Sequence, residues 1–189
     1  MPEPDKILEL VNKYYPLGID LDDIGLLNDT SAFKALISQC LNAQQLYDQH
    51  WTNMIDNIAG KFEVKVFDYT SPMPGNPAYI ASIVSDRSEQ CKLVLKISKL
   101  APFYTLYFDN LTSNYNYRLI RNNPVTPSEV MIIQHLKDEL SQYFKSYTPF
   151  DDLWYFITLP GMGNIAINNI KPYLDELLFG VDLSFHPTQ

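Results

Sequence analysis

The feature that most constrains this chain is a long run of apolar residues at helical spacing, which begins at Ser31 and ends near Gly60. The apolar positions recur every three or four residues over about seven turns, so they share one face of a helix. They are Phe33, Leu36, Ile37, Cys40, Tyr47, Trp51, Met54, Ile55 and Ile58. Gly60 fits the position just past a helix end. We therefore predict one long amphipathic helix that buries this face against another layer.

After Gly60 the period of the pattern drops to two, which is typical of half-buried strands. Four segments show it: residues 62–66, 79–85, 93–97 and 104–108. The connections between them are rich in turn residues and too short for crossover helices. We therefore predict an antiparallel meander of four to five strands. One face of this sheet should pack on helices while the other stays partly exposed to water.

A shorter helical signal precedes the long helix. Apolar residues at three-and-four spacing between Ile7 and Tyr15 predict a first helix. It should end before Pro16, because a residue ahead of proline disfavours the helical conformation. Residues 17–30 mix apolar positions with aspartates and show no clear period, so we predict an irregular acidic stretch there.

The C-terminal third begins with the clearest helix start in the chain. Thr126, Pro127 and Glu129 match a capping box with proline in the first turn. The apolar stripe that follows consists of Val130, Ile133, Leu136, Leu140, Tyr143, Phe144 and Tyr147. Residues 154–159 predict a buried strand, and residues 170–179 predict a closing helix that stops at Gly180.

The order of these elements predicts an α+β fold with N-terminal helices, an antiparallel four- to five-stranded meander, a long helix in the C-terminal half and a closing strand and helix. The 189 residues suit a single globular domain, residues 1–189. Within it we expect residues 1–60 to be helical, 61–125 mainly antiparallel sheet and 126–189 helix–strand–helix. An aromatic fraction of 13% argues against a disordered chain.

Targeting signals and cysteine usage bear on the compartment. The N-terminal residues lack the basic region, apolar run and small-residue cleavage site of a signal peptide. No uncharged apolar stretch approaches the roughly 20 residues needed to span a bilayer. Cys40 and Cys91 share no close spacing, which indicates neither a disulfide framework nor a zinc site. We therefore expect a cytoplasmic protein with reduced thiols.

Three motifs could carry chemistry, and each is incomplete. Gly161-Met162-Gly163 nominally matches a dinucleotide-binding turn, but too few residues follow it to build the parallel βαβ units of that fold. His135 and Glu139 lie one helical turn apart, as metal ligands or an acid–base pair would, yet no second histidine lies four residues away. The acids at residues 20–23 lack the glycine and terminal glutamate of a calcium loop. We predict no catalytic residue, no cofactor and no metal site.

Charge is distributed unevenly along the chain. The formal net charge of -8 divides into -6 over residues 1–60, +3 over residues 61–125 and -5 over residues 126–189. An acidic surface repels phosphate backbones and anionic lipid head groups, so unaided binding to nucleic acid or to a membrane surface is disfavoured. A basic protein partner is favoured instead.

Two groups of residues are candidates for a partner-binding surface, one acidic and one rich in the residue types of recognition loops. The acidic candidates are Asp20, Asp22, Asp23, Asp29, Asp151 and Asp152, and the recognition candidates are Tyr115, Tyr117 and Arg118. Tyrosine and arginine combine large contact area with adaptable hydrogen bonding. Tyrosines at every second position are also typical of a half-buried strand, so a hairpin is the alternative interpretation of residues 115–117.

These features predict a non-enzymatic, acidic protein-binding module. In general character such a chain is similar to the immunity proteins that neutralise bacterial toxins, which implies an inhibitor whose acidic surface occupies a basic toxin site. One alternative is a small acidic secretion-type chaperone, which would expose an apolar groove and form a homodimer. The other is a hydrolase or ligand-binding enzyme with a pocket between the sheet and the long helix.

Overall fold

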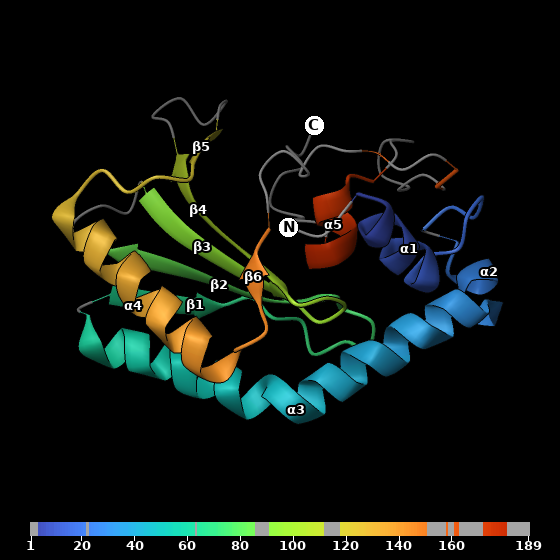
Figure 1. Ribbon diagram of the computed structural model, residues 1–189, viewed down its shortest axis with the longest axis horizontal. Helices are drawn as coiled ribbons and strands as arrows, with labels where there is room; N and C mark the ends of the chain where they lie inside the picture. Colours follow the sequence, from blue (N-terminus) through green and yellow to red (C-terminus); the bar gives the residue numbers. More distant parts are fainter. Residues whose placement is uncertain are drawn as a thin grey trace.

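The computed structural model describes residues 4–21, 23–62, 64–85, 91–111, 118–150, 158, 161–162 and 172–180. Its elements are α1 (Pro4–Tyr14), α2 (Ile24–Asp29), α3 (Ser31–Lys61), β1 (Val64–Asp68), β2 (Ala78–Ser85), β3 (Cys91–Ser98), β4 (Phe103–Leu111), β5 (Arg118–Arg121), α4 (Pro127–Tyr143), β6 (Thr148–Pro149) and α5 (Leu174–Phe179). The strands form one sheet in the order β1-β2-β3-β4-β5, and each of these strands runs antiparallel to its neighbour. Figure 1 shows α3 and α4 together along one face of the sheet, with α5 on the other side. The predicted α+β fold with an antiparallel meander is confirmed.

The 31-residue helix α3 carries the buried face that the sequence predicts. Its first turn is capped by Thr30, whose hydroxyl accepts the N–H of Phe33 at 3.1 Å. The buried residues of α3 are Leu36, Cys40, Ala43, Trp51, Met54 and Ile58. The helix ends later than predicted, because Gly60 is still helical and the N–H of Phe62 bonds the carbonyl of Ile58 at 3.1 Å. Phe62, which caps the helix, has an extended backbone with a φ of -113° and a ψ of 136°.

Apolar side chains gather in two clusters, and α3 contributes to both. The first cluster joins α1, the first half of α3 and α5, and includes Val11, Leu36 and Phe179. The second joins the second half of α3 and α4 to the sheet, and includes Trp51 and Leu136. The long predicted helix is therefore buried at both ends by different neighbours.

Two local features differ from the prediction. Residues 24–29 of the stretch that we predict to be irregular form α2, because the carboxylate of Asp23 accepts the N–H of Leu26 at 3.0 Å and starts a helix there. On α4 the capping box is as predicted, but Val130 is exposed and Ile132 is buried in its place. Ile133, Leu136 and Leu140 of the predicted stripe are buried, so the prediction is wrong only for its first residue, Val130.

β6 is a short strand that the sequence does not predict. It pairs in parallel with the start of β4. The N–H of Thr148 donates to the carbonyl of Pro102 at 2.9 Å, and the N–H of Phe150 donates to the carbonyl of Tyr104 at 2.8 Å. The chain after α4 is thereby fixed beside the turn between β3 and β4.

The sheet is buried on both faces along β3, whereas the alternating pattern predicts one partly wet face. Lys96 and Ser98 on β3 are buried, and so are Thr105 and Asp109 on β4. Polar residues at every second position predict a solvent-exposed face, but α5 contacts β2 and β3. The second face is therefore a buried polar surface.

The closing segment is described in part. α5 has six residues, fewer than the predicted helix over residues 170–179, and Gly180 follows it at a φ of 80°, a conformation that glycine adopts readily. The predicted stop is therefore confirmed. The predicted strand over residues 154–159 lies outside the described residues except for Thr158, which forms a bridge with Tyr173. Within the described ranges, no helix is long and apolar enough to cross a membrane.

Candidate functional site

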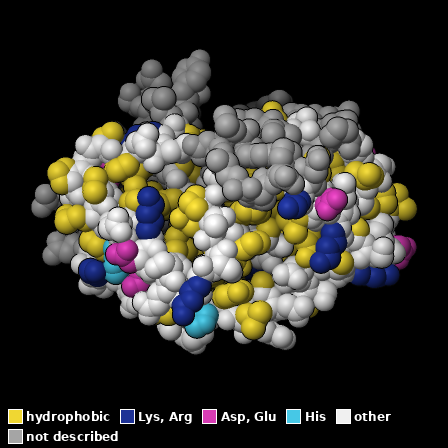
Figure 2. Space-filling view, viewed as in Figure 1, with side chains coloured by type: hydrophobic (Ala, Val, Ile, Leu, Met, Phe, Trp, Pro, Cys, Tyr) yellow, Lys and Arg dark blue, Asp and Glu magenta, His cyan; other side chains and the backbone are white. Residues whose placement is uncertain are grey.

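An exposed acidic and apolar surface lies around α2, and we call it the acidic edge. It consists of Asp20, Asp23 and Asp29 together with Leu17 and Leu26, all of which are exposed. Leu17 is 54% exposed and Leu26 is 58% exposed, so this surface offers apolar as well as acidic side chains to solvent. Figure 2 shows acidic side chains interspersed with lysines at the end of the molecule where α1 and α2 lie.

Local hydrogen bonds hold the acidic edge in place. The side chain of Asp23 caps α2, and the N–H of Thr30 bonds the carbonyl of Leu27 at 2.9 Å where α2 passes into α3. Leu27 itself is buried and anchors α2 to the rest of the molecule. At the other end, the N–H of Gly18 bonds the carbonyl of Gly161 at 2.8 Å. Leu26 is therefore presented on an ordered helix.

The structure brings together three of the predicted partner-binding residues, Asp20, Asp23 and Asp29. The others lie outside the described residues: they are Asp22, Tyr115, Tyr117, Asp151 and Asp152. Arg118 begins β5, and its side chain is outside the described part of the chain as well. The recognition candidates and the second acidic pair thus stay predictions.

The cap of α2 gives a direct test of this local structure. We expect Asp23→Ala to lower the free energy of unfolding by about 1 kcal/mol, because the N–H of Leu26 loses its acceptor. Asp23→Asn should be nearly neutral, since an asparagine oxygen caps equally well. Urea denaturation of both variants measures the difference, and equal stability of the two would contradict the capping role.

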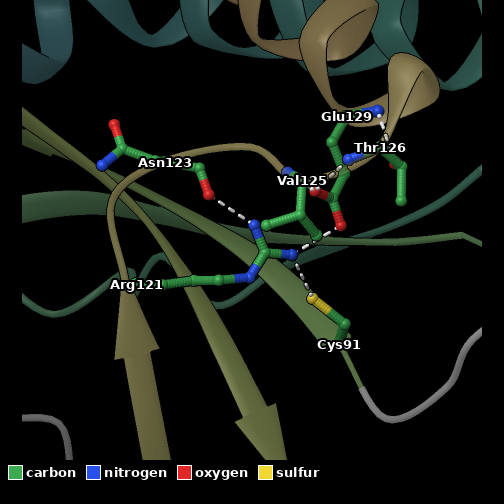
Figure 3. A network of polar contacts seen from close by, with 6 residues as sticks. All are labelled: Cys91, Arg121, Asn123, Val125, Thr126 and Glu129. Carbon is green, nitrogen blue, oxygen red and sulfur yellow. Dashed lines mark hydrogen bonds and ion pairs between the residues drawn. The ribbon is translucent and has the colours of Figure 1, made fainter.

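Cys91 lies in a polar network at the start of α4, shown in Figure 3. The guanidinium of Arg121 lies 3.4 Å from Cys91 Sγ and 2.6 Å from Glu129 Oε1, and its Cζ is 3.8 Å from the ring centroid of Phe108. Glu129 also accepts the N–H of Val125 at 2.7 Å. Burial raises the pKa of the Cys91 thiol although Arg121 acts to lower it. The thiol therefore stays protonated near neutral pH, and the network joins β5 to α4 rather than activating a nucleophile.

The pair of His135 and Glu139 joins α4 to the end of α3. Nε2 of His135 lies 3.6 Å from Glu139 Oε1, while Nζ of Lys61 lies 3.1 Å from His135 Nδ1. An ammonium group at that nitrogen competes with any metal ion for it. In the part of the chain that the structure describes, no group of three histidine, cysteine or acidic residues could hold a metal.

Lys99, just after β3, is a buried cation that the sequence analysis misses. Its side chain is 1% exposed, and within the described residues its Nζ has no hydrogen-bond partner. The Nζ lies 4.5 Å from the ring centroid of Tyr79, and the same ring stacks on Trp51. Burial lowers the pKa of Lys99 below its ordinary value. The signal was present in the sequence, because the period-two pattern of β3 continues to position 99 and places it on the face that packs on α3.

Two grooves open on the described surface. The first, of about 470 Å³, lies between α4 and β4, and the exposed Val130 is one of its lining residues. The second, of about 500 Å³, lies between α3 and the turn after β3, and Lys99 is one of its lining residues. Both volumes fall in the range that small-molecule sites occupy.

Comparisons with known proteins do not indicate a function for this chain. No family model matches the sequence, and no curated protein and no solved structure matches it. The features that bear on function are therefore the acidic edge, the two grooves and the buried Lys99.

Proposed function

We propose that this protein is a non-enzymatic binding module that recognises a basic protein partner through the acidic edge. The observation that carries the proposal is the exposed Leu26, which lies between the exposed carboxylates of Asp23 and Asp29 on an ordered helix. Apolar anchors surrounded by charged groups are typical of protein interfaces.

The two kinds of group in the acidic edge make different contributions to binding. Burying a leucine side chain under a partner contributes about 1.5–3 kcal/mol and mainly slows dissociation. Carboxylates at the rim attract a basic partner and mainly speed association. The net charge of -8 adds a long-range field of the same sign.

We base the inhibitor role on the chemistry expected of a basic partner. A protein that acts on nucleic acid or another polyanion needs a basic active surface, and an acidic module that covers this surface blocks access to it. We therefore propose an immunity-type inhibitor of a basic toxin as the particular function.

A second candidate function is that of a small acidic secretion-type chaperone, which would form a homodimer. A separate apolar patch favours it. Val125 is 73% exposed, and Val130 and Met131 are exposed beside it at the start of α4. This patch adjoins the 470 Å³ groove. A chaperone would hold an extended client there, whereas the acidic edge would hold a folded basic surface.

The test compares a double variant that lacks two carboxylates with a single variant that lacks the leucine, against one captured partner. The partner is captured from native lysate by cross-linking and identified, and its binding to the purified chain is then measured by surface plasmon resonance. We expect Asp23→Asn with Asp29→Asn to slow association about tenfold, and Leu26→Ala to speed dissociation by about tenfold or more.

A control removes the same charge elsewhere. Asp56 and Asp138 are exposed and lie outside the acidic edge, so Asp56→Asn with Asp138→Asn should slow association much less. Equal effects of the two double variants would show that only net charge matters. An unchanged dissociation rate for Leu26→Ala would move the interface away from α2.

A further inference from the structure

β1 is the last strand at one end of the sheet, and within the described residues it pairs only with β2. This pairing is regular from Val64 to Asp68, without a bulge that would turn the strand away from its open side. The side chains of residues 64–69 are all exposed or half-buried. An edge strand of this kind offers its unpaired backbone groups to another strand.

The backbone groups of Val66 and Asp68 face the open side of β1. The N–H of Tyr69 donates to the carbonyl of Ile80 on β2 at 2.8 Å, so the backbone groups of Tyr69 face β2. Successive residues of a paired strand direct their N–H and C=O groups to opposite sides. Asp68 and Val66 lie at the alternate positions and therefore direct theirs away from β2. Pairing with another strand would satisfy these donors and acceptors.

The aromatic side chains of β1 and of the residue after it are exposed beside this open edge. Phe67 is 44% exposed and Tyr69 is 57% exposed, and their rings stack with centroids 6.4 Å apart. Met73, in the connection from β1 to β2, is 70% exposed. Large apolar side chains that gather in this way on a surface are typical of interaction sites.

The charges of β1 favour an antiparallel partner with the same sequence. The exposed cation Lys65 lies near the start of the strand, and the exposed anion Asp68 lies at its end. Parallel pairing of two copies would place like charges side by side. Antiparallel pairing brings the Lys65 end of each strand to the Asp68 end of the other, so the charges are complementary. A two-fold axis generates this arrangement.

We propose that this protein forms a homodimer in which the β1 strands of two copies pair antiparallel about a two-fold axis at Phe67, so that one sheet runs through both copies. In this register Val66 of each copy lies opposite Asp68 of the second copy, and their N–H and C=O groups bond to each other. The two Phe67 side chains lie opposite each other. Lys65 lies opposite Tyr69 of the second copy, where its ammonium group can contact the face of the ring.

The backbone of β1 favours this register over the neighbouring one. A two-fold axis at Val66 would pair Val64 with Asp68 of the second copy and would need the N–H of Val64. That N–H already donates to the carbonyl of Phe62 at 2.6 Å. The dimer leaves the acidic edge accessible, because α2 precedes the long helix α3 and β1 follows it.

Cysteine cross-linking tests the register. Side chains opposite each other at a non-hydrogen-bonded pair have Cβ atoms about 4.5–5.5 Å apart, close to what a disulfide needs. We therefore expect Phe67→Cys to form a disulfide-linked dimer under mild oxidation, seen on a non-reducing gel. Lys65→Cys is the matched control, since its two copies would lie roughly 13 Å apart along the strands. Equal cross-linking of the two variants, or none with Phe67→Cys, would overturn the register.

Sedimentation velocity of the full chain tests the dimer itself. At physiological salt the repulsion between two chains of net charge -8 is screened beyond about 8 Å. We expect a monomer–dimer equilibrium in the unmodified chain and a dissociation constant at least about tenfold higher for Phe67→Lys, because two like charges then meet on the axis.

Val125→Lys is the matched control for this measurement. It makes the same change at a residue that is 73% exposed in the apolar patch at the start of α4, and it should leave the dimer intact. Circular dichroism checks that both variants fold. A chain that stays monomeric at every concentration would refute the proposal. A dimer that Val125→Lys disrupts and Phe67→Lys does not would place the interface at the α4 patch instead.

Discussion

Replacing Trp51 with alanine should lower the free energy of unfolding by about 3–5 kcal/mol. Trp51 is 3% exposed in the middle of α3, and its ring stacks on Tyr79 with centroids 5.3 Å apart. Its indole N–H also donates to Asp68 Oδ2 at 3.0 Å. The variant therefore leaves both a cavity and a carboxylate without its donor. Urea denaturation monitored by circular dichroism measures the loss.

Two further variants separate the causes of this loss. Trp51→Phe keeps an aromatic ring and removes the hydrogen bond, so we expect a smaller loss of about 1–2 kcal/mol. Leu46→Ala removes a large apolar side chain from the same helix at a position that is 66% exposed, and it should change stability by about 0.5 kcal/mol at most. A Trp51→Ala protein as stable as Leu46→Ala would contradict the packing of α3 on the sheet.

The position of Trp51 was predictable because burial on a long helix follows its period. The apolar residues of α3 recur often enough to define one face, and Met54 and Ile58 on that face are fully buried. The same argument holds for β3 and β4, where alternation sets which residues face α3 and α4. In a long periodic element, one or two residues that break the apolar pattern do not hide it. The type of such an element and the face that it buries could therefore be derived from the sequence.

Short elements and the second face of the sheet could not be derived in the same way. α2 has only six residues, so its start depends on one side chain, Asp23, and no period can reveal it. Lys96 alternates with apolar residues as a solvent-facing residue would, and its burial depends on the packing of α5, which lies far away in the sequence. Tertiary neighbours decide such positions, and a local pattern does not contain them.

The candidate sites differ in the same way: one could be predicted from the sequence, and the other could not. The acidic edge was visible in the sequence because its aspartates lie within ten residues of one another, although the exposure of Leu26 depends on the unpredicted α2. The groove beside Lys99 joins segments from α3, the turn after β3 and the chain after α4. No spacing in the sequence relates these segments, so only the folded chain shows that they meet.

Replacing Asp175 with asparagine should stabilise the protein at pH 7, by about 3 kcal/mol if the whole shift in its pKa is expressed. Burial of Asp175 at the start of α5 raises the pKa of its carboxyl from 3.8 to about 6, and Glu176 adds to this while Lys96 opposes it. Within the described residues its Oδ1 has no hydrogen-bond partner. The direction of the shift shows that the cost of burying the carboxylate outweighs its attraction to Lys96.

The pH dependence distinguishes this explanation from a simple change of charge. A carboxyl whose folded pKa is raised binds its proton more tightly in the folded state, so the wild-type protein loses this contribution as the pH rises from about 4 to about 6. The gain from Asp175→Asn should therefore be small at pH 4 and full at pH 7. Glu176→Gln removes the same charge one residue away and can still accept the N–H of Tyr173, so it should show only the smaller gain that comes from relieving its repulsion of Asp175. An Asp175→Asn protein less stable than wild type at pH 7 would show that the attraction between Asp175 and Lys96 dominates, and that the buried polar face of the sheet depends on this pair.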